Sequence, residues 1–95
     1  MTTDAELYSA LKYRVEVDRL GNKRYYHHSG QLHREDGPAV ILKTGSKFWF
    51  QNGELHREDG PAVTWTSGNM EWWINGVQYT ESEYCLQIKT LEYTV

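Results

Sequence analysis

The sequence has a single cysteine, Cys85, only two prolines and no long apolar run. One cysteine cannot close an intramolecular disulfide, so packing must hold the fold together. No stretch approaches the roughly 18 consecutive apolar residues that a membrane helix requires. The first residues carry an acidic side chain where a secretory leader would carry positive charge. We therefore expect a cytoplasmic protein with no membrane partner.

Positive charge is also scarce. Ten Lys and Arg residues stand against thirteen Asp and Glu, which gives a net charge of −3. This balance gives no general attraction to a phosphate backbone and disfavours nucleic acid as a partner. The length of 95 residues fits one small domain and excludes a multidomain enzyme.

The sequence does contain an internal repeat. The nine residues LHREDGPAV at 32–40 recur unchanged at 55–63, an offset of 23. Extending this offset without a gap aligns further residues in three units. The aligned sets are Gly30, Gly53 and Gly76; Tyr26, Trp49 and Trp72; Val17, Val40 and Val63; and Asn22, Gly45 and Gly68.

Each unit has the pattern of a β-hairpin. Segments of four to six residues rich in β-branched and aromatic side chains alternate with glycine-containing turns. The sequence predicts a mainly β fold: an antiparallel meander of three 23-residue β-hairpin repeats with a C-terminal α-helix. We divide the single domain 1–95 into a lead-in (1–12), three repeats (13–35, 36–58 and 59–79) and a helix with its tail (80–95).

The C-terminal helix is expected over residues 81–91. Thr80 followed by Glu83 forms a capping-box pattern. Tyr84, Ile88 and Leu91 then continue at helical spacing. Residues 4–11 are expected to form a short helix or an unstructured lead-in.

Residues 49–62 read Trp-x-x-Asn-Gly-x-x-His-Arg-Glu-Asp-Gly-Pro-Ala. With this pattern the chain resembles the variant of the MORN repeat, and more closely the small repeat proteins of tailed bacteriophages built from NGxLHREDGPA units. Residues 75–84 resemble the usual ending of those proteins, an acidic helix after the last hairpin. The resemblance covers about residues 13–84 and implies a β-hairpin-repeat fold and a phage or bacterial origin. It supplies no established catalytic residues, and it implies action on host machinery or host defences.

The repeated His-Arg-Glu-Asp motif has a structural and a functional interpretation. In the structural one, Asp36 and Asp59 accept hydrogen bonds from nearby backbone amides, and Arg34 and Arg57 pair with carboxylates. Gly37 and Gly60 would then adopt positive φ. In the functional one, His33 and His56 with their neighbouring carboxylates could hold a metal, although His-x-x-Asp is a weak ligand spacing. We expect no resident metal and no cofactor.

Catalysis is not expected. Cys85 has no motif around it, and no serine lies in a nucleophile-elbow or SxxK context. A metal-dependent hydrolase is the weakest alternative.

The aromatic residues favour protein contact. Adjacent residues such as Trp72 and Trp73 point to opposite faces of a sheet, so one of them is expected to stay partly exposed. The leading hypothesis is a non-enzymatic protein that binds and inhibits a host protein, in a defence or anti-defence role. Trp49, Trp72 and Trp73 would be its anchors, with Arg34, Arg57, His33 and His56 as polar binding residues.

Three further roles stay open. Homodimerisation is expected through the uncovered sheet or its edge strand. As an alternative function, the repeated Arg and His side chains could sequester a small anionic ligand such as a cyclic nucleotide signal. A purely structural role, for example in virion assembly, is also compatible with the sequence.

Overall fold

The structure is a computed structural model that describes residues 12–93. Its main element is a seven-stranded antiparallel sheet in the order β1-β2-β3-β4-β7-β8-β9, accompanied by the two-stranded sheet β5-β6. The elements are β1 (Arg14–Val17), β2 (Lys23–Tyr26), β3 (Val40–Ile41), β4 (Lys47–Phe48), β5 (Phe50–Gln51), β6 (Glu54–Leu55), β7 (Val63–Thr64), β8 (Met70–Ile74), β9 (Val77–Tyr79) and α2 (Glu81–Tyr93). The predicted mainly β hairpin meander with a C-terminal helix is therefore confirmed.

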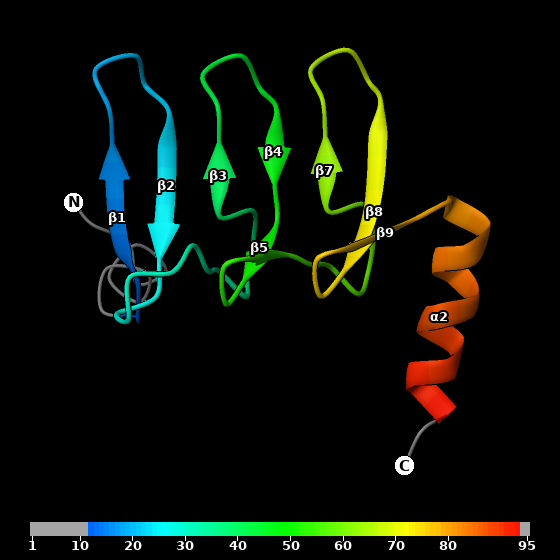
Figure 1. The fold of residues 1–95 in the computed structure, drawn as a ribbon. Helices are drawn as coiled ribbons and strands as arrows, with labels where there is room; N and C mark the ends of the chain where they lie inside the picture. The colour runs from blue at the N-terminus through cyan, green and yellow to red at the C-terminus, as the bar shows by residue number, and fades with distance from the viewer. Residues whose placement is uncertain (1–11, 94–95) are drawn as a thin grey trace.

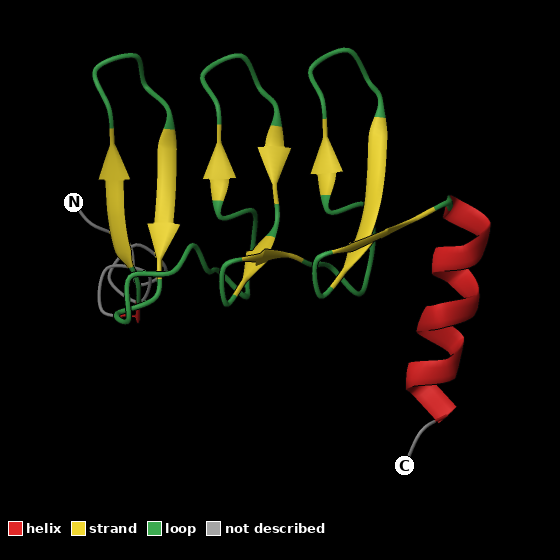
Figure 2. Cartoon of the chain, viewed as in Figure 1, coloured by secondary structure: helices red, strands yellow, loops and turns green. Residues whose placement is uncertain are grey.

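Three long hairpins, β1–β2, β3–β4 and β7–β8, stand side by side with their turns at the same end (Figure 1). The connecting loops, the small β5–β6 hairpin and α2 lie toward the other end, where the strands give way to loop (Figure 2). The HREDG segments therefore lie at the opposite end of the strands from the three turns.

The turns of the three long hairpins share one hydrogen-bond pattern. In the first, the amide of Gly21 donates to the carbonyl of Asp18 (3.1 Å) and the amide of Asp18 donates to the carbonyl of Asn22 (3.0 Å). The turns 42–46 and 65–69 repeat both bonds. Gly21, Gly45 and Gly68 have φ of +93°, +103° and +97°, so the alignment of Asn22 with the two later glycines was wrong by one residue.

A second kind of turn lies at the opposite end of the strands, between β5 and β6 and between β8 and β9. Asn52-Gly53 and Asn75-Gly76 form two-residue turns in which all four residues have positive φ, as a type I′ hairpin requires. The first unit uses a longer turn instead: the amide of His27 donates to the carbonyl of Gln31 (2.8 Å). His27 and His28 thus lie after β2, in a turn that contains one additional residue.

This additional residue shifts the frame of the first unit. The amide of His33 donates to the carbonyl of Tyr25 (3.1 Å), as the amide of His56 donates to that of Trp49 (3.0 Å). Tyr25, and not Tyr26, therefore corresponds to Trp49.

The alignment of Val17 with Val40 and Val63 fails for the same reason. Arg24, Val40, Phe48 and Val63 lie in one row of cross-strand partners, and β1 contributes Glu16 to that row. Val17 lies outside this row and is 61% exposed.

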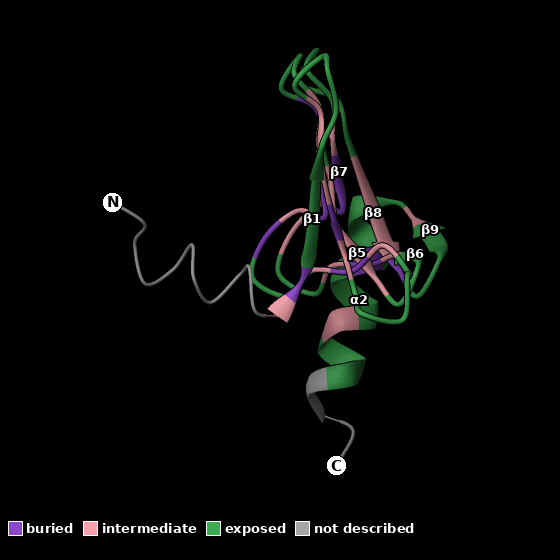
Figure 3. Cartoon of the chain, turned by 90° about the vertical axis from the view of Figure 1, so that its left-hand side faces the viewer, coloured by how far each residue is buried: buried purple, intermediate pink, exposed green. Residues whose placement is uncertain are grey.

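The core lies in the half of the molecule that contains the loops. Figure 3 shows the sheet edge-on: the long hairpins form a single layer near their turns, and buried segments gather where the loops cross the strands. The buried apolar residues are Tyr13, Tyr25, Ala39, Val40, Ala62, Val63, Ile74 and Tyr84. The set includes two fully buried alanines, Ala39 and Ala62, whose small side chains allow close packing.

Helix α2 begins as the capping box predicts. The amide of Thr80 donates to Glu83 Oε1 (2.9 Å) and the amide of Glu83 donates to Thr80 Oγ1 (3.2 Å). The helix extends two residues beyond the predicted end. The expectation for residues 4–11 lies outside the described residues. Within the described part of the chain, no helix has the length and apolar character to cross a membrane.

Candidate functional site

Each arginine of the repeated motif is held by its own unit. The guanidinium carbon of Arg57 lies 3.9 Å from the centre of the Trp49 ring, and that of Arg34 lies 4.0 Å from the Tyr25 ring. Arg57 Nε also donates to Asp59 Oδ1 (2.8 Å), and its Nη1 donates to the carbonyl of Pro61 (3.1 Å). Arg34 makes the same two bonds, to Asp36 and Pro38, at 3.1 and 3.2 Å. The two arginines therefore fasten the loop onto the sheet.

The glycines of the motif leave room for the arginine side chains and do not form a turn with positive φ. Gly37 and Gly60 are not among the residues with positive φ, so that expectation was wrong. A Cβ placed on Gly60 would lie 2.9 Å from Arg57 Cζ, and one on Gly37 would lie 2.9 Å from Arg34 Cζ. Glycine is needed because the guanidinium is confined between the aromatic ring and the loop backbone. The aspartates, expected to accept from backbone amides, accept from the arginines instead.

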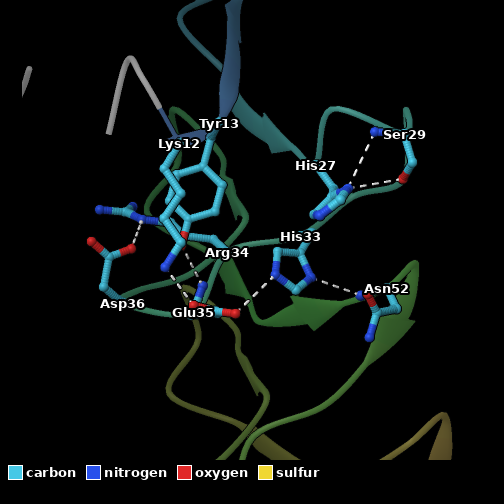
Figure 4. Close-up of polar contacts among 9 residues, drawn as sticks. All are labelled: Lys12, Tyr13, His27, Ser29, His33, Arg34, Glu35, Asp36 and Asn52. Carbon is cyan, nitrogen blue, oxygen red and sulfur yellow. Dashed lines mark hydrogen bonds and ion pairs between the residues drawn. The ribbon is translucent and has the colours of Figure 1, made fainter. Parts of the chain in front are cut away.

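The two histidines of the motif connect one unit to the next. His33 Nδ1 accepts a hydrogen bond from the amide of Asn52 (2.9 Å), and His56 Nδ1 accepts one from the amide of Asn75 (3.0 Å). Both side chains are buried. An accepting Nδ1 places the proton on Nε2. For His33 this nitrogen lies 3.5 Å from Glu35 Oε1 (Figure 4). The histidines hold the Asn-Gly turns in place.

A tyrosine from outside the motif anchors each loop. The Tyr13 hydroxyl accepts from the amide of Glu35 (2.9 Å), as Figure 4 illustrates for the first loop. The Tyr84 hydroxyl donates to the carbonyl of Arg57 (2.5 Å) and accepts from the amide of Gly60 (3.3 Å). Burial raises the pKa of Tyr84. The sequence predicted Tyr84 only as a helix residue and placed Tyr13 only at the start of the first repeat, because nothing in the spacing points from either tyrosine to the loops.

The tryptophans are distributed over both faces of the sheet. Cross-strand partners share a face. Tyr25, Trp49 and Trp72 therefore lie on one face, and Phe48, Trp65 and Trp73 lie on the other. Of the three predicted anchors, Trp49 is covered by Arg57, while Trp72 and Trp73 point to opposite sides. The structure does not bring the three together.

Trp65 is the residue that the sequence argument undervalued. The residue is 39% exposed, and its ring packs edge-on against Phe48, with centroids 5.2 Å apart. Glu71 accepts from both indoles on this face, at 2.7 Å from Trp65 Nε1 and 2.9 Å from Trp73 Nε1. We call Phe48, Trp65, Glu71 and Trp73 the indole face. The period-2 register from Val63 to Trp65 is the signal that could have found it.

Two surface grooves of about 400 Å³ each lie on the molecule. The first, which we call the Trp72 groove, is lined by Met70, Glu71, Trp72, Gln78, Tyr79, Thr80, Glu81 and Glu83. The second runs between the two HREDG loops and contains Glu35, Asp36, Trp49, Gln51, Arg57, Glu58 and Asp59. Three predicted binding residues line these grooves, Trp72 in the first and Trp49 and Arg57 in the second, but the sequence gave no sign of either groove.

The side chains that could bind a metal or act as a nucleophile do not form a cluster among the described residues. Across residues 12–93, no group of three or more His, Cys, Asp or Glu side chains is arranged to hold a metal ion. Cys85 is exposed on α2.

The comparisons with known proteins gave no match, whether with protein-family models, with curated proteins or with solved structures.

Proposed function

We propose that the protein is a non-enzymatic binding protein that engages another protein through its third long hairpin, β7–β8, and the adjoining β9. The observation that carries this proposal is that the tryptophans differ in how far other side chains cover them. Trp49 also borders a groove, but its ring is covered by Arg57. Trp65 is 39% exposed, and Trp72 lines its groove with no guanidinium of the described residues stacked on it. Partly exposed tryptophans are typical anchors of protein interfaces because they bury a large area with few rotatable bonds.

The resemblance to phage repeat proteins suggests a bacterial host protein as the partner, whose activity binding would inhibit. The arginines and histidines of the motif are not part of this proposed surface, because they are already bonded within the loops. The same contacts do not favour the alternative of a small anionic ligand, since each guanidinium already donates to an aspartate and a carbonyl.

Affinity capture from bacterial lysate followed by mass spectrometry tests the proposal. Trp65→Ser should lower recovery of the specific partner by about tenfold or more, the size expected of an interface hot spot. Leu20→Ser is the matched control, because Leu20 is 69% exposed in the turn of the first long hairpin. This control should recover the partner like the wild type. Equal recovery by both variants, or no specific partner for the wild type, would contradict the proposal.

A further inference from the structure

The third unit lacks an arginine that the first two units have. The offset of 23 residues takes Trp49 to Trp72 and Arg57 to Thr80. Trp72 pairs with Tyr79, and Trp49 pairs in the same way with His56, which is 23 residues before Tyr79. The second and third units therefore correspond in space as well as in sequence. Among the described residues, no arginine or lysine is stacked over Trp72.

The Trp72 groove lies where that guanidinium would be. Trp72 lines it together with Thr80, which stands at the position of Arg57. The volume of about 400 Å³ accommodates a side chain of arginine size. In the two preceding units, the same ring position is covered by a guanidinium at 3.9 and 4.0 Å. The fold itself thus shows which group suits this site.

The charge of the groove fits a cation. Glu81 and Glu83 line the groove. In the second unit the corresponding residues are Glu58 and Gly60. The two amide and hydroxyl contacts from Thr80 lower the pKa of Glu83, which stays ionised at neutral pH. The amino end of α2 contributes a partial positive charge of about half a unit, which two full carboxylates outweigh.

We infer that the Trp72 groove takes the guanidinium of an arginine side chain from the partner protein, stacked on Trp72 and paired with Glu81; this inference rests on the proposed protein-binding function. Arginine fits better than lysine because its planar group stacks on a ring while its edge donates to carboxylates. The partner's arginine would make in the third unit the ring contact that Arg34 and Arg57 make in the other two. Its carboxylate partner would be Glu81, because Ser82 stands at the position of Asp59.

The test is a titration of the full chain with the peptide acetyl-Gly-Arg-Gly-amide, followed by the NMR signal of the Trp72 indole N–H. We expect a saturable shift at millimolar concentrations. A peptide with citrulline, which has the same shape without the charge, should give none, and a lysine peptide should bind more weakly. No saturable shift, or equal binding of the citrulline or lysine peptide, would overturn the inference.

Two variants locate the site. Trp72→Ala, followed by the backbone amide signal of Thr80 because the indole signal is then lost, should weaken binding of the arginine peptide by about tenfold or more, and Glu81→Gln should weaken it by about threefold. Glu81→Gln keeps the test valid if the tryptophan variant does not fold. Glu58→Gln is the matched control, because Glu58 is the equivalent exposed residue in the preceding unit, and it should bind like the wild type. Weakening by Glu58→Gln equal to that by Glu81→Gln would overturn the assignment to this groove.

The two proposals can fail separately. A captured partner that is lost with Trp65→Ser but fully retained with Trp72→Ala would overturn the arginine groove and leave the protein-binding function. Binding of the arginine peptide without any specific partner in the lysate would support the groove and contradict the function.

Discussion

At the scale of single residues, the repeated motif is a set of interlocking contacts in which each residue type has one task. Arg57 covers Trp49, Asp59 and the Pro61 carbonyl orient the guanidinium, and Gly60 leaves room for it. A stacked, partly buried guanidinium contributes about 1–2 kcal/mol, and its hydrogen bonds contribute a similar amount. The motif is conserved between the two loops of this chain because each contact depends on the others.

The dependence of Gly60 on Arg57 can be measured by a double-mutant cycle. Gly60→Ala alone should lower the free energy of unfolding by about 1–3 kcal/mol, because the new Cβ displaces the guanidinium. In an Arg57→Ala background the same change should cost far less. The measurement is urea unfolding of the four proteins.

Gly68 provides the control for this cycle. A Cβ there meets nothing within 4 Å, but φ is +97°, so Gly68→Ala should cost the same with or without Arg57. Additive effects of Gly60→Ala and Arg57→Ala would contradict the account.

Asp18 gives a prediction for pH. Its carboxylate accepts from the side chain and the amide of Asn22, each at 3.0 Å, and these bonds lower its pKa to about 2. Its unfolded value is about 3.9. The stabilisation is therefore complete above about pH 4 and is lost as the pH falls through about 2. Relative to Asp18→Asn, the wild type should lose stability between these values, and a carboxyl titration by NMR with a midpoint near 4 would disprove this.

At the scale of the elements, the hairpins and the helix could be predicted, but the frame of the first unit could not. Glycine turns and β-branched or aromatic segments define the hairpins locally, and Thr80 with Glu83 defines the start of α2. The additional residue lies in the turn 27–31, where Gly30 still matches Gly53 in sequence. An ungapped alignment cannot detect it, because the glycine and the motif after it stay in register while β1 and β2 shift.

The candidate site was less predictable for a related reason. Spacing identified the tryptophans but not the groups that cover them, since the contact of Arg57 with Trp49 joins residues of different local elements. The strand alternation does place Trp72 and Trp73 on opposite faces. The groove over Trp72 follows only from the absence of an arginine at position 80 combined with the pairing of Trp72 and Tyr79.

Shortening the first turn tests the frame. Replacing residues 28–30 by Asn-Gly should give a folded protein whose free energy of unfolding lies within about 1 kcal/mol of the wild type, because the type I′ turn of the second unit then serves the first. The measurement is thermal unfolding followed by circular dichroism.

The matched control changes the turn of the second unit. Replacing Asn52 and Gly53 by alanines should cost about 2–4 kcal/mol, because both residues have positive φ. Loss of folding in the shortened variant, with the alanine variant unaffected, would contradict the assigned frame.

At the scale of the whole molecule, the chain is an array in which each unit contacts its neighbours. His33 bonds to the turn of the second unit and His56 to that of the third, and the sheet runs through all the long hairpins. Tyr13 and Tyr84 close the array at its two ends. Strand β1 ends the sheet, so the homodimer expected through an edge strand stays a prediction.

An array of this kind should accept another unit. Inserting a second copy of residues 36–58 after residue 58 should lengthen the sheet by about 10 Å, the width of two strands. The longer protein should also be more stable, because it gains one interface between neighbours. Small-angle X-ray scattering and urea unfolding measure the two effects, and an unfolded or aggregated product would count against the array.

The central claim is that the residues of the repeated motif stabilise the fold, and that the partner protein binds to the third unit instead. The most direct measurement is the free energy of unfolding of the double variant Arg34→Ala, Arg57→Ala, with Arg14→Ala as the control for an exposed arginine near a ring. The account predicts a loss of about 4–8 kcal/mol for the double variant, against less than about 1 kcal/mol for the control. A double variant as stable as the wild type would show that the arginines are not structural, and would contradict the account.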